Sequence, residues 1–242
     1  MKILFIASHP LLSIGYSRIA NILSNHLADN HDVYYFAYSN HKGQDMAIKR
    51  TINEKIKFID VIEEEMRLKM ITNPNESKYG RELFLPTLYK IQPDIVFIYN
   101  DIIVSRNLLY QFQTYYHAVK VYLYIDLVYE CQRFDLFDVA FRYVDRLFVF
   151  SDFWKTHITD YMEYPEDKTS IIYHGLNGNI TRVDKLEARK KLDIPENGFV
   201  ILNTNRNSYR KHNDLVIHAF LLFLKSQNMN SNLFLFLNCE MD

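Results

Sequence analysis

The sequence predicts an α/β fold built on a parallel β-sheet. The first observation is that short apolar runs, rich in β-branched and aromatic residues, alternate with segments whose apolar residues recur at helical spacing. The second is the run KILFIAS (2–8), which is apolar almost without interruption. Such a run is typical of a strand covered on both faces, as in a parallel sheet. Strands that alternate with helices along a chain favour this architecture.

The first helix is expected at 15–29, directly after the first strand. Its apolar residues recur at the spacing of one helix face: Ile19, Ile22, Leu23 and Leu27. We therefore expect this face to pack on the sheet.

Six more strands are expected in the first part of the chain, at 32–39, 55–61, 93–101, 118–127, 146–152 and 169–175. Helices are expected near 76–92, 102–116, 133–143 and 153–162. Pro86 should kink or interrupt the first of these helices, because proline lacks an amide hydrogen and its ring clashes with the preceding turn. Ser151 is expected to be the N-cap of the last one.

The composition changes after the last of these strands. Glycines, asparagines, a charge run and a proline gather there, which is typical of a crossover between domains. His174 and Gly175 lie at its start, and the glycine is expected to allow the chain to cross over. The segment LEARKKL (186–192) is expected to be a short solvated helix, because exposure best explains its charges.

These boundaries predict a first Rossmann-like domain at 1–175, a linker at 176–198, and the beginning of a second Rossmann-like domain at 199–242. The second unit is expected to contain only a strand at 199–204, a helix at 212–227 and a strand at 233–238. Two strands and one helix cannot bury a core by themselves. We therefore expect the chain to be the N-terminal part of a longer protein.

Bulk composition argues against several classes of protein. The 242 residues have a net charge of −1, so no overall basic field attracts nucleic acid or an anionic membrane. The N-terminus does not resemble a signal peptide, and no apolar window is long enough to span a bilayer. Cys131 and Cys239 lie far apart and form neither a metal-ligand spacing nor a disulfide framework. We expect a cytoplasmic protein without a bound metal or a cofactor.

The segment LNTNRNSYRKHNDLVIHAF (202–220) places three cations between an apolar strand and a helix: Arg206, Arg210 and Lys211. The helix dipole makes cations mildly unfavourable at a helix start, but it favours a bound anion, and phosphate is the usual one. Arg206 and Lys211 can both reach one polyanion, the first as a planar fork and the second as a point charge. A surface pair without a ligand is the alternative.

The first strand–helix junction, ASHPLLSIGYSRIA (7–20), carries a second candidate. Gly15 lies at a helix start, where the absence of a side chain lets a ligand approach the helix N-terminus. It is a single glycine and not G-x-G-x-x-G, so a simple loop glycine is an equal alternative. His9 could line a pocket at this strand end, or it could be a surface loop histidine.

Two aspartates close strands, Asp101 in IYND and Asp126 in YIDL. Because the carboxyl ends of parallel strands meet at one edge of a sheet, both face the same edge as Gly15. An N-cap role is favoured for Asp101. A functional role is favoured for Asp126, because apolar Leu127 and Val128 follow it instead of a polar helix start. Its carboxylate could bind a sugar hydroxyl or orient a nucleophile, and it is our candidate catalytic residue.

Four stretches give the chain a resemblance to a known family: IGYSRI, PDIVFIYND, YLYIDLV and above all LNTNRNSYRKHNDL. The whole chain resembles the retaining glycosyltransferases of the GT-B fold, of the group 1 or family 4 type, and especially the versions encoded by large DNA viruses. In that family an Arg and a Lys after the first strand of the C-terminal domain bind the donor diphosphate. The resemblance carries these roles over onto Arg206 and Lys211, and the role of the first-loop glycine onto Gly15.

The resemblance implies that a sugar moves from a nucleotide-sugar donor to a carbohydrate or glycosylated acceptor, with retention and without a metal. Two departures stand out. In many members a His precedes the strand-end Asp, and this His contacts the donor sugar. Here Ile125 occupies that position, so the role of Asp126 is in question. The E-x7-E element that grips the donor sugar and ribose would lie beyond residue 242, so we expect this chain alone to be inactive.

Two other functions are considered. A non-catalytic nucleotide-sugar or carbohydrate-binding module of the same fold is the main alternative. A flavodoxin-like or response-regulator-like protein is disfavoured by the crossover and by the new strand that starts at 199.

Overall fold

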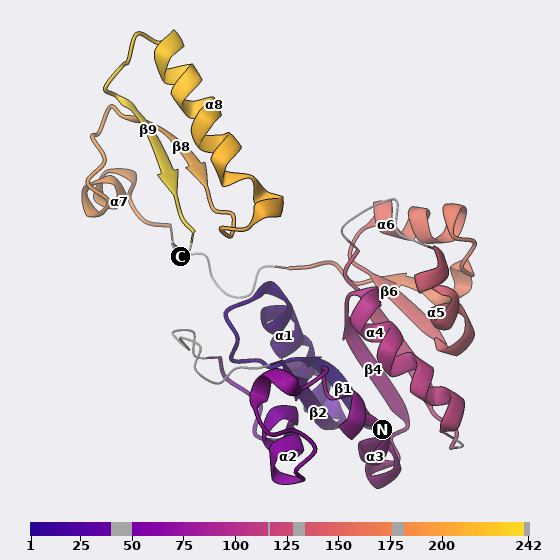
Figure 1. The fold of residues 1–242 in the computed structure, drawn as a ribbon. Coiled ribbons are helices and arrows are strands. Elements are labelled where there is room, and N and C mark those ends of the chain that lie inside the picture. The colour runs from indigo at the N-terminus through magenta and orange to yellow at the C-terminus, as the bar shows by residue number, and fades with distance from the viewer. Residues whose placement is uncertain (40–49, 116, 128–133, 176–181, 240–242) are drawn as a thin grey trace. The chain divides into compact units, whose positions relative to one another are not determined.

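The computed structural model describes residues 1–39, 50–115, 117–127, 134–175 and 182–239 (Figure 1). The chain forms two compact units, Met1–Asn177 and Gly178–Asp242. Each unit is an α/β structure with parallel strands, which confirms the predicted fold class.

The first unit is built on a parallel sheet with the strand order β3-β2-β1-β4-β5-β6-β7. Its strands are β1 (Lys2–Ser8), β2 (Asp32–Tyr38), β3 (Lys57–Asp60), β4 (Ile95–Asn100), β5 (Lys120–Ile125), β6 (Arg146–Val149) and β7 (Thr169–Ile171). The chain adds β2 and β3 on one side of β1 and then returns to add β4 on the other side. The strand order therefore reverses between β1 and β4, which is where ligands bind in open sheets of this kind.

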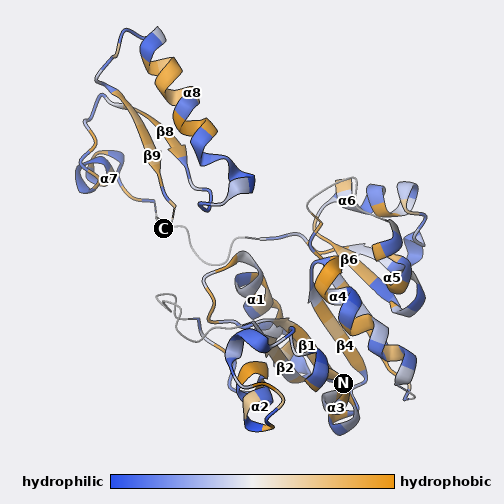
Figure 2. Cartoon of the chain, in the orientation of Figure 1, coloured by the Kyte–Doolittle hydropathy of each residue, from blue (hydrophilic) through white to orange (hydrophobic). Residues whose placement is uncertain are grey.

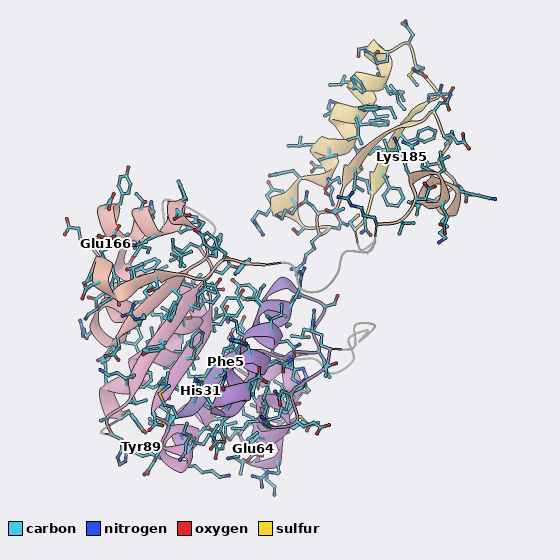
Figure 3. All side chains as sticks on the ribbon, turned by 180° about the vertical axis from the view of Figure 1, so that it is seen from behind. Phe5, His31, Glu64, Tyr89, Glu166 and Lys185 are labelled. Atoms are coloured by element: carbon cyan, nitrogen blue, oxygen red, sulfur yellow. The ribbon has the colours of Figure 1, made fainter. Side chains whose placement is uncertain are left out.

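Helices cover both faces of this sheet: α1 (Gly15–Asn30), α2 (Val61–Arg67), α3 (Arg81–Ile91), α4 (Ile102–Leu109), α5 (Asp138–Tyr143) and α6 (Asp152–Thr156). Side chains of β1 alternate between two apolar cores. Leu4 and Ile6 pack with α3 and α4, whereas Ile3 and Phe5 face α1. Phe5, labelled in Figure 3, is fully buried between the rings of Tyr35 and Phe97. Burial of such a side chain stabilises a fold by about 1.5–3 kcal/mol.

The predicted face of α1 packs against the margin of the core, and other residues of the helix are buried more deeply. The fully buried residues of α1 are small or polar: Ser17, Ala20, Asn21, Ser24 and Ala28. The larger Ile19, Leu23 and Leu27 are only partly buried at the margin of the core, and Ile22 is half-exposed. The helical spacing of the largest apolar residues predicts one face, whereas small residues form the part of the helix surface that lies closest to the sheet.

The segment between β3 and β4 also differs from the prediction. α2 was not expected, although the Asp60 carboxylate caps it by accepting a hydrogen bond from the backbone N–H of Glu63 (3.0 Å). α3 begins only after Gly80, whose φ of 73° is unfavourable for other residues. The helix then continues through Pro86, so the expected interruption does not occur.

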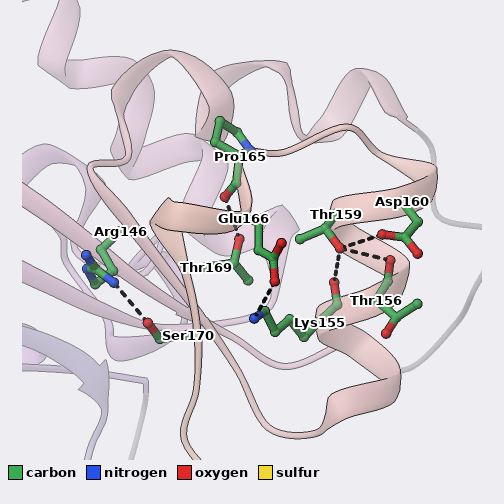
Figure 4. Close-up of polar contacts among 9 residues, drawn as sticks. All are labelled: Arg146, Lys155, Thr156, Thr159, Asp160, Pro165, Glu166, Thr169 and Ser170. Atoms are coloured by element: carbon green, nitrogen blue, oxygen red, sulfur yellow. Dashed lines mark hydrogen bonds and ion pairs between the residues drawn. The ribbon is translucent and has the colours of Figure 1, made fainter.

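Polar contacts join α6 to the turn before β7, and β6 to β7, at this edge of the sheet (Figure 4). The Lys155 ammonium group pairs with the Glu166 carboxylate at 3.0 Å, and the Arg146 guanidinium donates to the Ser170 hydroxyl at 2.9 Å. The predicted N-cap of α6 is confirmed, because the Ser151 hydroxyl accepts a hydrogen bond from the Trp154 N–H (3.4 Å).

The second unit contains α7 (Lys185–Lys191), β8 (Phe199–Asn203), α8 (Asn213–Ser226) and β9 (Leu233–Leu237). β8 and β9 pair in parallel, and both are hydrophobic along their length in Figure 2. Large apolar side chains remain exposed, such as Phe199 (60%) and Leu202 (61%). α7 has no buried residue, which confirms that it is a solvated helix. Across the residues described in both units, no helix has the length and apolar character to cross a membrane.

Candidate functional site

Two groups of candidate residues lie at the carboxyl ends of strands, one group in each unit. In the first unit, Asp126 directly follows β5, and its N–H donates to the carbonyl oxygen of Asn100 at the end of β4 (3.2 Å). The hydroxyl of Tyr16 on α1 is hydrogen-bonded to the Asp126 carboxylate. The fold thus brings the helix that starts at Gly15 against Asp126, at the point where the strand order reverses.

The environment of Asp126 disfavours its charged form. Burial raises the pKa of this half-buried carboxyl group, and the nearby Asp101 carboxylate raises it further. The hydrogen bond from Tyr16 and the attraction of His174 lower the pKa in part. A carboxyl group with a pKa perturbed by burial and by named charged neighbours is typical of functional sites.

Aromatic rings surround this carboxylate. Tyr99 and Tyr124 stack with their centroids 4.9 Å apart, and Tyr16 lies 5.4 Å from Tyr99. His174 stacks on Phe150 at 5.0 Å with an interplanar angle of 19°. The sequence assigned His174 no functional role, because nothing local indicates that the chain after β7 returns to the end of β5.

Gly15 is the first residue of α1, and no cap shields that helix end. The preceding Ile14 makes no side-chain cap hydrogen bond, and the first turn contains no acidic residue. A Cβ atom added at Gly15 would meet nothing within 4 Å, so packing does not require glycine here. The absence of a side chain leaves the first amide groups of the helix accessible.

The remaining strand-end candidates have structural roles. Asp101 caps α4 by accepting a hydrogen bond from the Val104 N–H at 2.9 Å, as favoured by the sequence. His9 is not a surface histidine: it is 3% exposed, contacts the Phe58 ring edge-on, and lies 3.6 Å from the Asp60 carboxylate.

An arginine that the sequence did not single out shapes the first loop. One guanidinium nitrogen of Arg50 donates to the carbonyl oxygens of Pro10 and Leu12, both at 2.6 Å. These bonds fix the loop between β1 and Gly15. The contact joins residues about forty positions apart, so no local pattern predicted it.

In the second unit, two buried asparagines close the loop between β8 and α8. Asn203, the last residue of β8, donates from its amide to the side-chain oxygen of Asn213, the first residue of α8, at 3.2 Å. Asn213 in turn donates to the Arg206 carbonyl oxygen and to the Asn207 side chain, both at 3.5 Å. Asn203 also accepts two hydrogen bonds from Asn205. We call the Asn203–Asn213 pair the asparagine clasp.

The clasp holds the predicted cations beside the start of α8. Arg206 lies in the closed loop, and Arg210 and Lys211 belong to the short helical turn Tyr209–Lys211. The N-cap residue of α8, His212, has a φ of 48° and makes no side-chain cap hydrogen bond. Among the described residues, the side chains of these three cations form no ion pair. The loop therefore combines free positive charge with an uncapped helix N-terminus, which is an arrangement that suits an anion.

Two further features lie outside these groups. A cavity of about 710 Å³ is lined mainly by residues of β3, α2 and α3, and none of the candidate residues lines it. In the described ranges, no group of three or more His, Cys, Asp or Glu side chains could hold a metal ion.

Solved structures show the same fold. A glycosyltransferase from Rickettsia africae is 15% identical, with a TM-score of 0.59 over 98% of this chain and 68% of that one. A trehalose-6-phosphate synthase is 11% identical, with a TM-score of 0.58 over 98% of this chain and 64% of that one. A UDP-GlcNAc 2-epimerase from Neisseria meningitidis, bound to UDP-GlcNAc, is 14% identical, with a TM-score of 0.56 over 100% of this chain and 67% of that one.

The chain has the GT-B fold. It spans about two thirds of the length of these solved structures. Identities of this size show the fold alone, and the fold is shared by transferases and an epimerase. No protein-family model matches the sequence, and neither does any curated protein.

Proposed function

We propose that the protein is a retaining glycosyltransferase of the group 1 or family 4 type, which takes a sugar from a nucleotide-sugar donor. The observation that carries this proposal is the clasped loop between β8 and α8, which presents Arg206 and Lys211 at an uncapped helix start. In this proposal the two cations bind the donor diphosphate, as in the family that the sequence resembles. The solved epimerase of the same fold binds UDP-GlcNAc, which supports a nucleotide sugar as the ligand.

The chemistry follows from where charge develops. When the bond between sugar and phosphate breaks, the leaving nucleoside diphosphate gains negative charge. Fixed cations and helix amides stabilise that charge more strongly in the transition state than in the ground state, which accelerates transfer. In this proposal Arg206 and Lys211 supply that stabilisation, and no bound metal is required.

The first unit supplies the acceptor side in this proposal. Asp126 is the candidate catalytic residue, because its half-buried carboxylate lies at the carboxyl edge of the sheet and, among the described residues, the bond from Tyr16 leaves acceptor positions unused. It would bind and orient the acceptor hydroxyl. Gly15 would leave the start of α1 accessible to a phosphate oxygen. A cytoplasmic location belongs to the same proposal.

Titration calorimetry with UDP, UDP-glucose and UDP-GlcNAc tests the donor site. Each cation would make charge-assisted contacts worth about 1.5–3 kcal/mol, so Arg206→Ala or Lys211→Ala should weaken binding about ten- to a hundredfold. Arg206→Lys should restore only part of the affinity, because a point charge cannot reproduce the planar fork. Arg210→Ala is the matched control, since Arg210 is an exposed neighbour in the same turn and should matter much less.

The outcomes separate the alternatives. Equal losses for Arg206→Ala and Arg210→Ala would indicate a diffuse basic patch and contradict a specific diphosphate site. Binding of a nucleotide sugar without any chemical change would favour the non-catalytic module. A change of sugar configuration without an acceptor would favour an epimerase, which shares this fold.

A further inference from the structure

His174 has no part in the donor site, yet it lies among the rings that surround Asp126. Besides stacking on Phe150, its imidazole makes edge contacts with Tyr124 at 5.7 Å and with Tyr99 at 6.3 Å. Tyr124 precedes Asp126 by two residues on β5, and Tyr99 lies on the neighbouring strand β4. His174 and Asp126 therefore share one edge of the sheet although they lie far apart in sequence.

The fold fixes the place of His174. The Tyr124 hydroxyl donates to the carbonyl oxygen of Ile172, and the Ile172 N–H donates to the carbonyl oxygen of Val149 (2.8 Å). These bonds attach the chain after β7 to β5 and β6 only two residues before His174. Stacking on Phe150 then orients the ring.

Both side chains remain accessible to a ligand. His174 is exposed and Asp126 is half-buried. Among the described residues, one side-chain hydrogen bond, from Tyr16, occupies the Asp126 carboxylate, whereas a carboxylate has about four acceptor positions. A neutral imidazole offers one donor and one acceptor.

The charges around the pair favour a neutral ligand. The groups that face it are Tyr16 from α1, Tyr99 from β4, Tyr124 from β5 and the Asp101 carboxylate. Two carboxylates disfavour an anion here. Although His174 is exposed, its imidazole is partly desolvated where it stacks on Phe150, which lowers its pKa, so its neutral form predominates at neutral pH. A pair of adjacent hydroxyl groups matches this arrangement, because one hydroxyl can donate to the carboxylate, which only accepts, and its neighbour can donate to or accept from the neutral imidazole.

We propose that Asp126 and His174 form a binding subsite for a sugar ring, in which the carboxylate accepts from one hydroxyl and the imidazole bonds to its neighbour. His174 thereby supplies a second polar contact at the carboxyl edge of the first unit. This inference rests on the proposed function in one respect, namely that the bound sugar is the acceptor of the transfer. Binding itself does not depend on the donor.

Ligand-observed saturation-transfer NMR tests the subsite, with D-glucose, D-mannose, D-galactose and N-acetyl-D-glucosamine examined one at a time. At least one of these sugars should bind the wild-type protein. Asp126→Asn and His174→Phe should each weaken that binding about tenfold or more, as expected for a lost hydrogen bond to a charged or polar partner. His174→Phe retains an aromatic ring that can stack on Phe150, and His174→Asn retains a polar group, so the two variants separate packing from hydrogen bonding.

A second readout is insensitive to simple loss of packing. In Asp126→Asn the pKa of His174, followed by NMR, should fall below its wild-type value, because the Asp126 charge raises it. Arg206→Ala should leave sugar binding unchanged while it weakens UDP binding. If the wild-type protein bound no UDP but showed His174-dependent sugar binding, the proposed donor site would be overturned and this subsite would stand. Equal sugar signals from the wild type and His174→Phe, or none from any of the four sugars, would overturn the subsite.

Discussion

The asparagine clasp predicts that a residue without a role in ligand contact controls the donor loop. Asn213→Ala removes the acceptor of the Asn203 amide (3.2 Å) and the donor to the Arg206 carbonyl and the Asn207 side chain (3.5 Å each). Asn203 and Asn213 are each only 9% exposed, so water does not readily replace these bonds. A buried amide that loses its partner costs about 1–3 kcal/mol, and the two longer contacts contribute less.

This cost should appear as opening of the loop. Since about 1.4 kcal/mol is a factor of ten in an equilibrium constant, hydrogen exchange of amides in 203–213 should accelerate roughly five- to a hundredfold in Asn213→Ala. UDP binding should weaken as well, because binding to the variant must also order the open loop, and this ordering costs free energy. Asn207→Ala is the control, as it removes only one long contact of an exposed residue. Unchanged exchange in Asn213→Ala would refute the clasp.

Three further outcomes are expected. Gly80→Ala should destabilise the first unit by about 2–4 kcal/mol, measured by denaturant unfolding, because the added Cβ would lie 2.6 Å from the Phe36 ring at a φ of 73°. Gly15→Ala should leave the melting temperature nearly unchanged, since nothing lies within 4 Å of its added Cβ, and a large fall would contradict the open helix start. Asp126→Asn should raise the melting temperature at neutral pH. Burial raises the pKa of Asp126 in the folded state, so its contribution to stability is most favourable at acidic pH and falls as pH rises through that pKa. Asparagine carries no charge, so the variant does not lose stability in this way. The gain should vanish at acidic pH, and a lower melting temperature at neutral pH would count against the burial argument.

Much of the sheet could be predicted from the sequence because its strands are continuous apolar runs. The run at 2–8 matches β1, and the expected strand at 233–238 differs from β9 by one residue. Helix predictions were weaker where the largest residues do not define the buried face. α2 has the sequence VIEEEMR, whose three consecutive glutamates give it no apolar periodicity, although Glu65 is buried.

The candidate sites were predicted only in part, because their contacts are long-range. The cations before α8 stood out as a local pattern, but the asparagines that close their loop did not. The neighbourhood of Asp126 depends on Tyr16 from α1 and on His174 from the chain after β7. Only the sheet order brings these residues together, and strand order is not contained in the residues of any one segment.

Chemical-shift mapping with UDP tests the central claim most directly, because it locates the diphosphate without requiring turnover. The backbone amide signals of the wild-type protein should shift in 204–214, the loop between β8 and α8, and these shifts should be lost in an Arg206→Ala, Lys211→Ala double variant. The melting temperature of the double variant should stay near that of the wild type, since neither cation forms an ion pair among the described residues. UDP-induced shifts that avoid 204–214, or that persist in the double variant, would contradict the diphosphate site.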